Sequence, residues 1–364
     1  MVKNKKKRVI VGMSSGVDSS VAAALLQQQG YEVVGVFMHF WKESVAESLA
    51  ENKCCSLESL EDARRVCQIL GIPLYTANAE KEFKREVVDY FLDEYAGGRT
   101  PNPCVACNEF IKFRVLLKKM LEMGGDFIAS GHYSRIEKKV VGTEIKYHLF
   151  CGKDKDKDQS YFLYNFNQKQ LAKILFPIGG YEKPAIRKIA QKLGLPVFDK
   201  DDSQGLCFTP EKYPENFLRR NLKLKKGSIV NTDGKILGVH EGLPLYTIGQ
   251  RRGINIGGNG PYYVVNKDLQ SNSLVVTNNK EDAALFCNKM EVERVNWIVA
   301  QPILPCQVWV KVRYRHPMVS AIIKEGKNDT YEVEFMEPQQ AISPGQSAVF
   351  YTEAGEMLGG GRIK

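Results

Sequence analysis

The apolar and polar residues in the first half of the chain follow a pattern that predicts strands and helices in regular alternation. Short β-branched or aromatic runs favour strands, and longer stretches with an apolar stripe favour helices. The predicted strands are Arg8–Gly12, Tyr31–Met38, Ile72–Ala77 and Asp126–Ser130, and the predicted helices are Ser19–Gln29, Ser59–Leu70 and Phe110–Met123. This order predicts a parallel sheet with helices on both faces.

The pattern changes beyond about residue 211, where short alternating runs are separated by turn residues. These runs are Ser228–Asn231, Tyr262–Asn266, Ser273–Thr277, Val308–Tyr314, Ser320–Lys324, Tyr331–Phe335 and Ala348–Tyr351. Short strands at regular spacing predict β-rich modules, and we expect the last module to be a small barrel. The sequence therefore predicts a doubly wound α/β domain at 1–210, a central β-rich domain at 211–291 and a C-terminal β-barrel at 292–364.

The length, charge and cysteine content of the chain indicate which domains, binding partners and cellular compartment to expect. The 364 residues fit two or three domains, and 51 Lys and Arg against 42 Asp and Glu give a net charge of +9, which suits a polyanion such as RNA. No apolar run is long enough for a membrane span and no signal segment precedes the first strand, so we expect a cytoplasmic protein with no membrane contact. Nine irregularly spaced cysteines favour a transient, catalytic disulfide over a structural framework.

The segment Ser14–Ser19 (SSGVDS) lies between the first predicted strand and the first predicted helix. Backbone N–H groups and the helix dipole at such a junction form a phosphate site. The segment lacks the Lys of the P-loop and the three glycines of the dinucleotide fingerprint, so neither motif applies. The alternative is that Ser and Asp merely cap the helix.

A second candidate site combines cysteines from two polar loops. Cys104 and Cys107 follow the prolines of the turn TPNPCVACN, and Cys207 ends the segment DDSQGLC. We expect Cys107 to lie at or near a helix start, where the helix N-terminus stabilises a thiolate and Lys112 and Arg114 add positive potential. Cys104 and Cys107 could instead form a thioredoxin-like pair, or half of a zinc site with Cys54, Cys55 or Cys67.

The other cysteines have simpler interpretations. Cys67 is in phase with the apolar face of its predicted helix, which indicates a structural residue. Cys151, Cys287 and Cys306 carry no motif and are expected to be small buried side chains.

Taken together, eight segments in one order resemble the tRNA-specific 2-thiouridylases of bacteria, which belong to the ATP pyrophosphatase superfamily. The segments are Gly12–Ser20, Phe37–Met38, Asn102–Phe113, Ser130–Tyr133, Lys157–Leu163, Ser203–Phe208, Tyr246–Gly253 and Lys311–Arg315. Ser15 stands where the family loop S-G-G-x-D-S has its first glycine, and Cys104 stands where many members have Asp. The acid–base role of a carboxylate at that position therefore does not carry over to this chain.

The resemblance implies roles for particular residues. Cys107 would be the nucleophile, and Cys207 would carry a persulfide. The residues implied for ATP are Gly12, Met13, Ser14, Ser15, Gly16, Val17, Asp18, Ser19, Met38 and Gly131. The residues implied for tRNA are Asn102, Pro103, Cys104, Lys112, Lys157, Asp158, Gln159, Arg251, Arg252, Arg313 and Tyr314. No residue is assigned to a metal, and His132 could contact the nucleotide or support a neighbour.

The implied reaction forms 2-thiouridine at the wobble uridine of tRNAs of the Lys, Glu and Gln types. ATP would adenylate the uridine C2 oxygen, and Mg²⁺ would neutralise the phosphates. A cysteine desulfurase or sulfur-relay protein would load Cys207, and a cellular thiol reductant would reset a Cys107–Cys207 disulfide. The rival interpretations are another ATP pyrophosphatase, which needs no such cysteines, and a non-catalytic RNA-binding protein.

Overall fold

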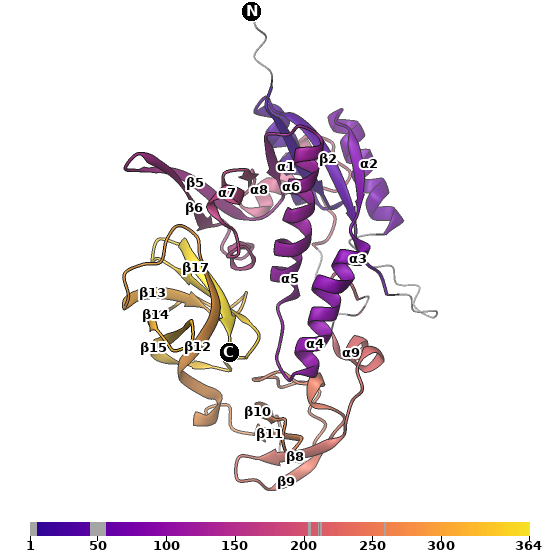
Figure 1. Cartoon of the computed structure of the whole chain (residues 1–364). Helices are drawn as coiled ribbons and strands as arrows, with labels where there is room; N and C mark the ends of the chain where they lie inside the picture. The colour runs from indigo at the N-terminus through magenta and orange to yellow at the C-terminus, as the bar shows by residue number, and fades with distance from the viewer. Residues whose placement is uncertain (1–5, 44–55, 203–204, 210, 212, 258–259) are drawn as a thin grey trace, which may run out of the picture.

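The structure is a computed structural model that describes residues 6–43, 56–202, 205–209, 211, 213–257 and 260–364. The described residues form three sheets, one in each part of the molecule (Figure 1). No helix among these residues combines the length and the apolar character needed to cross a bilayer.

The N-terminal sheet is parallel and has the strand order β3-β2-β1-β4-β7. Its strands are β1 (Arg8–Met13), β2 (Glu32–His39), β3 (Leu74–Asn78), β4 (Phe127–Ala129) and β7 (Ile174–Leu175). Each predicted strand agrees with an observed one to within two residues at either end. β7 was not predicted, because a strand of two residues is too short to show an alternation of apolar and polar residues.

Helices cover both faces of this sheet, as the sequence predicts. Successive side chains of a strand point to opposite faces. Val9 and Val11 of β1 therefore join the core cluster that includes α1 (Val17–Gln28), α2 (Leu57–Leu70) and α8 (Lys183–Lys192). Ile10 joins the cluster on the other face, which includes α6 (Phe113–Glu122).

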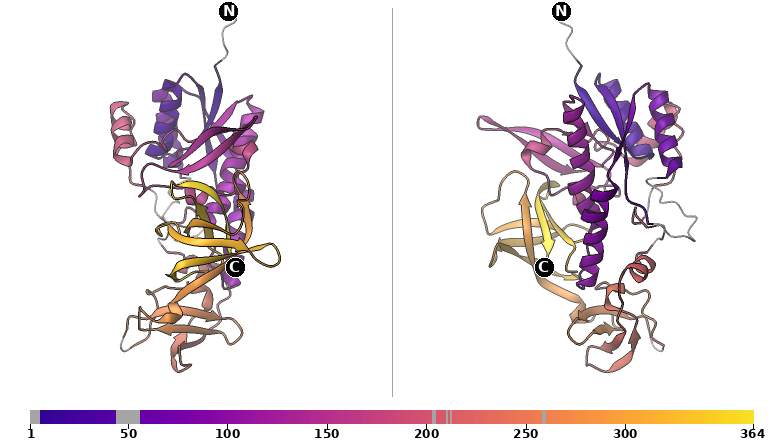
Figure 2. Two further views of the ribbon diagram at one scale, coloured as in Figure 1. Left: turned by 90° about the vertical axis from the view of Figure 1, so that its left-hand side faces the viewer. Right: turned by 45° about the vertical axis from the view of Figure 1, so that its right-hand side comes forward.

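Two helical rods run side by side from the parallel sheet toward the central domain (Figures 1 and 2). One rod comprises α3 (Glu80–Phe83), the π-helical η1 (Lys84–Asp89) and α4 (Tyr90–Ala96), and the other comprises α5 (Pro103–Ala106), the π-helical η2 (Cys107–Lys112) and α6. The second rod begins seven positions before the predicted Phe110. The side chain of Asn102 caps it, and Pro103 occupies the first turn, where its missing N–H is harmless.

The central sheet is small and mixed, with the order β10-β11-β8-β9. It contains β8 (Gly227–Asn231), β9 (Ile236–His240), β10 (Tyr263–Asp268) and β11 (Ser273–Thr277), and α9 (Glu215–Asn221) precedes it. β11 pairs with β8 in parallel, while the other pairings are antiparallel.

The C-terminal strands form an antiparallel barrel that closes through the pairing of β12 with β17. The strands are β12 (Phe286–Trp297), β13 (Cys306–Lys311), β14 (Val319–Glu325), β15 (Thr330–Gln340), β16 (Ser347–Tyr351) and β17 (Glu356–Ile363). A hairpin of β5 (Ser134–Val141) and β6 (Glu144–Cys151) extends this sheet through β17. The boundary expected between residues 291 and 292 falls inside β12, because this long strand pairs first with β15 and then with β17.

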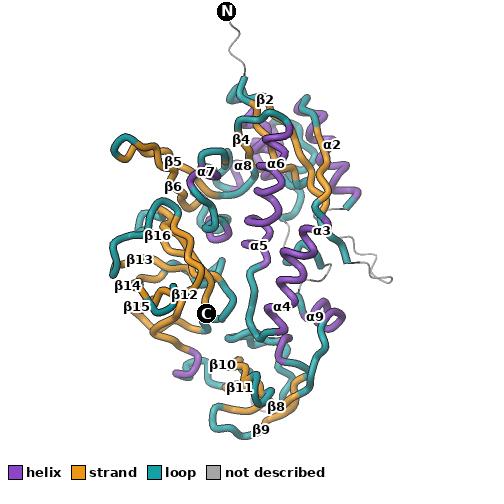
Figure 3. Tube along the Cα trace, viewed as in Figure 1, coloured by secondary structure: helices purple, strands orange, loops and turns teal. Residues whose placement is uncertain are grey.

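Short helical turns complete the chain (Figure 3). They are η3 (Ser160–Phe162), α7 (Gln168–Leu171), η4 (Leu243–Leu245) and η5 (Ala283–Leu285).

Candidate active site

The predicted phosphate loop joins the carboxyl end of β1 to α1. Gly16 is the N-cap of α1, and no side chain caps the helix. The hydroxyl of Ser19 instead accepts from the Ser14 N–H (3.2 Å) and donates to the Gly16 carbonyl (3.2 Å). The capping alternative is therefore wrong, and the first turn of α1 presents its backbone N–H groups and its positive dipole end.

Two backbone features shape this loop. Ser15 is buried and has φ = +58°, a left-handed conformation that favours glycine. Gly131, which follows β4, lies so close to α1 that a Cβ there would be 2.6 Å from the Ser19 nitrogen. A residue larger than glycine at position 131 would push the loop away from the strand ends.

Asp18 carries the loop's only carboxylate and is held by two partners from other elements. Tyr133 donates to one oxygen (2.7 Å), and the ammonium of Lys183 lies 2.9 and 2.8 Å from the two oxygens. The Lys183 side chain is only 9% exposed. The loop thus combines N–H groups, a carboxylate and a buried cation, which is a set that suits a metal-bound polyphosphate.

Sequence reasoning missed Lys183, although the chain contains a signal for it. Lys183 and Pro184 open α8, and a cation is unfavourable at the positive end of a helix dipole. A buried lysine at this position therefore needs anionic partners. It has Asp18 and also Asp202, whose carboxylate lies 2.7 Å away.

The turn before the cysteines is held by all three parts of the molecule. Thr100 donates its N–H to the Pro344 carbonyl of the barrel (2.8 Å) and its hydroxyl to Thr247 of the central domain (3.3 Å). Gln346 donates to the carbonyls of Thr100 (3.0 Å) and Pro101 (3.1 Å). The domains therefore fix the entry to α5.

The helix that contains Cys104 and Cys107 begins at Pro103, earlier than expected, so a different thiol lies in its first turn. Cys104 lies in the first turn of α5 and is exposed, whereas Cys107 begins η2 one turn later and is 3% exposed. Placing Cys107 at the helix start was wrong, because the Asn102 cap and Pro103 start the helix earlier. Stabilisation by the first turn applies to Cys104 rather than to Cys107.

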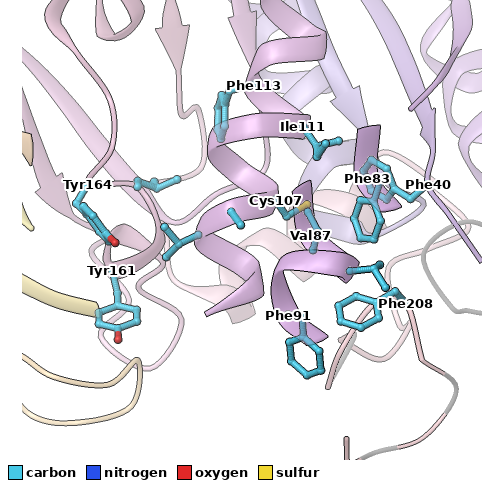
Figure 4. Close-up of a cluster of buried hydrophobic side chains, with 14 of the residues drawn as sticks. Phe40, Phe83, Val87, Phe91, Cys107, Ile111, Phe113, Tyr161, Tyr164 and Phe208 are labelled. Carbon is cyan, nitrogen blue, oxygen red and sulfur yellow. The ribbon is translucent and has the colours of Figure 1, made fainter. Parts of the chain in front are cut away.

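Cys107 belongs to a buried cluster of apolar and aromatic side chains (Figure 4). Phe208 joins this cluster, with ring centroids 5.2 Å from Phe91 and 6.0 Å from Phe83. Its neighbour Cys207 is half-buried and packs against the same cluster. The structure therefore brings the two cysteine segments into one cluster, although Ser203 and Gln204 of the second segment lie outside the described residues.

Three consecutive residues expected on tRNA make contacts within the protein instead. Asp158 is buried and accepts hydrogen bonds from the N–H groups of Gly152 (3.0 Å) and Ser160 (3.1 Å). Its expected contact with tRNA stays a prediction. Lys157 pairs with Asp202 at 2.6 Å. Gln159 accepts from the Tyr133 N–H at 3.1 Å.

The basic residues of the later domains divide into two groups. Arg251 and Arg252 are exposed, and Arg252 donates to the Tyr213 hydroxyl (2.9 Å). Arg313 donates to the carbonyls of Ile248 (3.4 Å) and Ala341, and burial lowers the pKa of its guanidinium. The guanidinium of Arg313 thus joins the barrel to the central domain, and its expected tRNA contact stays a prediction.

Tyr314 and His132 lie beside aromatic rings. The ring centroid of Tyr314 is 4.5 Å from that of Phe162. Burial, and then the charge of Lys112, lowers the pKa of His132 to about 3. A hydrogen bond of 2.8 Å joins His132 to Ser130. His132 is thus a neutral ring near neutral pH.

The remaining nucleotide candidates are framework residues at the strand ends. Gly12 and Met13 end β1, Met38 lies on β2 and is nearly buried, and Val17 opens α1. A Cβ on Gly12 would be 3.2 Å from Leu116, so α6 packs directly on this strand.

The other cysteines are partly as expected. Cys67 is buried on α2, and burial raises the pKa of its thiol to about 11, which confirms a structural residue. Cys151 and Cys306 are half-buried, but Cys287 is exposed on β12, so its expected burial is wrong. Cys54 and Cys55 of the zinc alternative lie outside the described residues. Within the described part of the chain, no three His, Cys, Asp or Glu residues are grouped as metal ligands.

The fold and the loop define a nucleotide-binding α/β protein with two added β domains. Residues 7–211 match the family model of a tRNA methyl transferase HUP domain, residues 215–278 that of a tRNA methyl transferase PRC-barrel domain, and residues 287–363 that of an aminomethyltransferase beta-barrel domain. The tRNA-specific 2-thiouridylase MnmA of Geobacter metallireducens is 44% identical to this chain, and the alignment covers 100% of this chain and 98% of the relative. MnmA 2 of Clostridium tetani is 45% identical over 98% of each chain. This chain belongs to the tRNA-specific 2-thiouridylase family of sulfurtransferases.

Solved structures resemble the chain more distantly. A 4-thiouridine synthetase–RNA complex with bound ATP aligns with 59% of the residues of this chain and 50% of the residues of the synthetase chain. The aligned residues are 16% identical, and the TM-score is 0.35. NMN synthetase from Francisella tularensis covers 55% and 67%, with 17% identity and a TM-score of 0.32.

Proposed function

We propose that this protein forms 2-thiouridine at the wobble uridine of tRNA in an ATP-dependent reaction, with Cys107 and Cys207 as its working thiols. The observation that carries this proposal is the packing of both cysteine segments into one apolar cluster. Phe208, the neighbour of Cys207, packs against Phe83 and Phe91 of the helical rod that lies beside the rod of Cys107 (Figure 1). Sulfur transfer would need the two thiols to meet. The cytoplasm, where tRNA and ATP meet, is the site that we propose for this activity.

The loop between β1 and α1 is the proposed nucleotide site. Its N–H groups and Lys183 would bind the phosphates of ATP, and Asp18 would hold Mg²⁺, which neutralises phosphate charge when bound. Positions of these groups support the proposal: α1 has no side-chain cap, and Lys183 lies 2.8 Å from Asp18. In this site ATP would adenylate the C2 oxygen of uridine and release pyrophosphate.

The cysteines would then deliver sulfur. A cysteine desulfurase or relay protein would convert Cys207 to a persulfide. Attack by the Cys107 thiolate on the inner sulfur of that persulfide forms the Cys107–Cys207 bond and expels the outer sulfur, which displaces AMP from C2. A thiol reductant must then cleave the disulfide before the next turnover.

The tRNA would approach from the exposed side of the turn that contains Asn102, Pro103 and Cys104. A uridine in the anticodon loop has to leave its stack to reach the thiols, which favours a single-stranded loop over a duplex. Tyr314, whose ring centroid lies 4.5 Å from that of Phe162, is the aromatic residue that we assign to contact with tRNA. Arg251 and Arg252 are the exposed cations that we assign to phosphate contacts.

Methyl transfer is named in two of the matching family models, but the full-length relatives carry thiouridylase names. We favour thiolation, because methyl transfer gives no reason to bring Cys107 and Cys207 into one cluster. A non-catalytic RNA-binding protein likewise has no need for the buried ion pair between Lys183 of α8 and Asp18 of the phosphate loop.

The test is conversion of unmodified tRNA by the purified protein with Mg-ATP, cysteine and a cysteine desulfurase. Nucleoside mass spectrometry should find 2-thiouridine, and pyrophosphate should be released. Asp18→Ala should abolish both products, whereas Asp199→Ala, which removes an exposed carboxylate, should not. Unchanged pyrophosphate release by Asp18→Ala would refute the nucleotide site, and wild-type protein that forms no 2-thiouridine would refute the function.

A further inference from the structure

Tyr133 immediately precedes β5, and its side chain reaches the phosphate loop. The hydroxyl donates to one carboxylate oxygen of Asp18 at 2.7 Å, and the residue is only 2% exposed. Burial, and then the negative charge of Asp18, raises the pKa of this hydroxyl, so it stays protonated and remains a hydrogen-bond donor. A buried and neutral donor therefore holds the carboxylate of the phosphate loop.

The backbone of Tyr133 is fixed by Gln159, which lies in the segment between β6 and η3. The Tyr133 N–H donates to the side-chain oxygen of Gln159 at 3.1 Å, and the Gln159 N–H donates to the Tyr133 carbonyl at 2.9 Å. Gly152 lets the chain pass close by, since a Cβ there would lie 2.8 Å from the Tyr133 carbonyl oxygen. Tyr133 thus presents its hydroxyl to Asp18 from a fixed position.

Asp18 has a second donor, but we assign that donor to another task. Among the described residues, the side chains that hydrogen-bond to Asp18 are those of Tyr133 and Lys183. The phosphates of a bound nucleotide would compete with the carboxylate for the ammonium of Lys183. A carboxylate turns readily about its last side-chain bond, and carboxylates that bind a metal are oriented by hydrogen bonds from neighbouring groups. Tyr133 supplies such a bond without depending on Lys183.

We infer that Tyr133 is a positioning residue that holds the Asp18 carboxylate in the orientation needed to bind the Mg²⁺ of the nucleotide. This inference rests on the proposed function, because it takes Mg-ATP as the ligand of the phosphate loop. It predicts that loss of the Tyr133 hydroxyl weakens nucleotide binding only through Asp18, and only when Mg²⁺ is present.

The test is equilibrium binding of α,β-methylene-ATP to the full-length protein, measured by titration calorimetry in Mg²⁺ and again in EDTA. This analogue cannot release pyrophosphate, so binding is measured without reaction. Tyr133→Phe removes the hydroxyl and retains the ring. Tyr164→Phe is the matched control, because Tyr164 is also buried but its hydroxyl lies 3.1 Å from that of Ser347 in the barrel. Asp18→Ala, alone and combined with Tyr133→Phe, completes a double-mutant cycle.

In Mg²⁺, Tyr133→Phe should bind the analogue about tenfold more weakly than the wild type, because groups that orient a metal ligand change metal affinity by about 10–100-fold. In EDTA the two proteins should bind the analogue equally. Tyr164→Phe should match the wild type under both conditions. In the Asp18→Ala background, Tyr133→Phe should have no further effect, since two residues that act through one group are not additive.

Equal affinity of Tyr133→Phe and the wild type in Mg²⁺ would overturn the proposal. A loss of the same size in EDTA, or one that persists in the Asp18→Ala background, would also overturn it, because either result shows a merely structural role. Gln159→Ala is the second variant, since it removes the oxygen that accepts from the Tyr133 N–H and should weaken Mg²⁺-dependent binding about threefold. If Tyr133→Phe does not fold, unchanged binding by Gln159→Ala refutes the role of Tyr133.

Asp18→Ala separates failure of this proposal from failure of the proposed function. If Asp18→Ala binds the analogue in Mg²⁺ as tightly as the wild type does, the proposed nucleotide site fails. If Asp18→Ala binds weakly while Tyr133→Phe binds as the wild type does, only the role of Tyr133 is refuted.

Discussion

The ammonium of Lys311 lies 3.0 Å from a carboxylate oxygen of Asp158, and the two side chains are 11% and 3% exposed. Lys311 ends β13 of the barrel, while Asp158 lies in the segment between β6 and η3. The hydroxyl of Ser160 also donates to Asp158, at 3.0 Å. A buried carboxylate with these partners joins two domains, and we infer a structural role for it.

Replacement of Asp158 should therefore reduce stability. Removing one partner of a buried ion pair leaves the other charge uncompensated, and we expect Asp158→Ala to lower the free energy of unfolding by about 3–5 kcal/mol. Urea unfolding measures this loss, with Asp156→Ala as the control at an exposed position two residues away. Weaker tRNA binding by Asp158→Ala at wild-type stability would restore the expected RNA contact.

Ser15 offers a test of backbone strain in the phosphate loop. A left-handed conformation costs a non-glycine residue about 1–2 kcal/mol, while glycine loses about 0.5–1 kcal/mol more entropy on folding. Ser15→Gly should thus leave stability unchanged or raise it by up to about 1.5 kcal/mol, with equal or tighter ATP binding. Thermal unfolding and calorimetric titration measure both quantities. A clear loss of ATP affinity would show that the serine hydroxyl contacts the nucleotide.

Arg251 and Arg313 should behave differently when each is replaced by alanine. If exposed Arg251 contacts a phosphate, its loss should reduce the slope of log K against log salt by about 0.7–0.9 at unchanged stability. Arg313→Ala leaves buried carbonyls without their donor and should destabilise the protein by about 1–3 kcal/mol without changing the slope. Filter binding at several salt concentrations and urea unfolding separate the two. A flattened slope for Arg313→Ala alone would reverse our assignment.

Most of the fold could be predicted because its strands and helices carry strong periodic patterns. β11 was located at its observed bounds, Ser273–Thr277, and α2 to within two residues. The start of α5 was misplaced because its cap residue Asn102 lies among prolines, which were interpreted as a turn. β12 was missed because it alternates buried and exposed residues irregularly across a bulge.

The candidate site was predicted in part. Motifs identified the loop at Ser14–Ser19 and both cysteine segments, because these are local features of the chain. Lys183 was not predicted as a site residue, because its partners Asp18 and Asp202 are distant in sequence and only the fold brings them close to it. The internal contacts of Asp158 and Arg313 could not be predicted, because sequence gives the charge of a side chain but not its burial.

The choice of thiols is the central claim, and Cys104 makes it testable. Cys104 is exposed in the first turn of α5, so it has the better access to solvent, while Cys107 lies in the buried cluster with Phe208. We expect Cys107→Ser and Cys207→Ser each to abolish thiolation while ATP binding persists. Cys104→Ser, the matched control on the same helical rod, should retain substantial activity.

The most direct measurement is peptide mapping of the protein after one turnover on tRNA without reductant. We expect a peptide in which Cys107 is joined to Cys207, formed in proportion to the 2-thiouridine produced, and equally present in the Cys104→Ser variant. A bond between Cys104 and Cys207, together with full activity of Cys107→Ser, would contradict our assignment of the nucleophile.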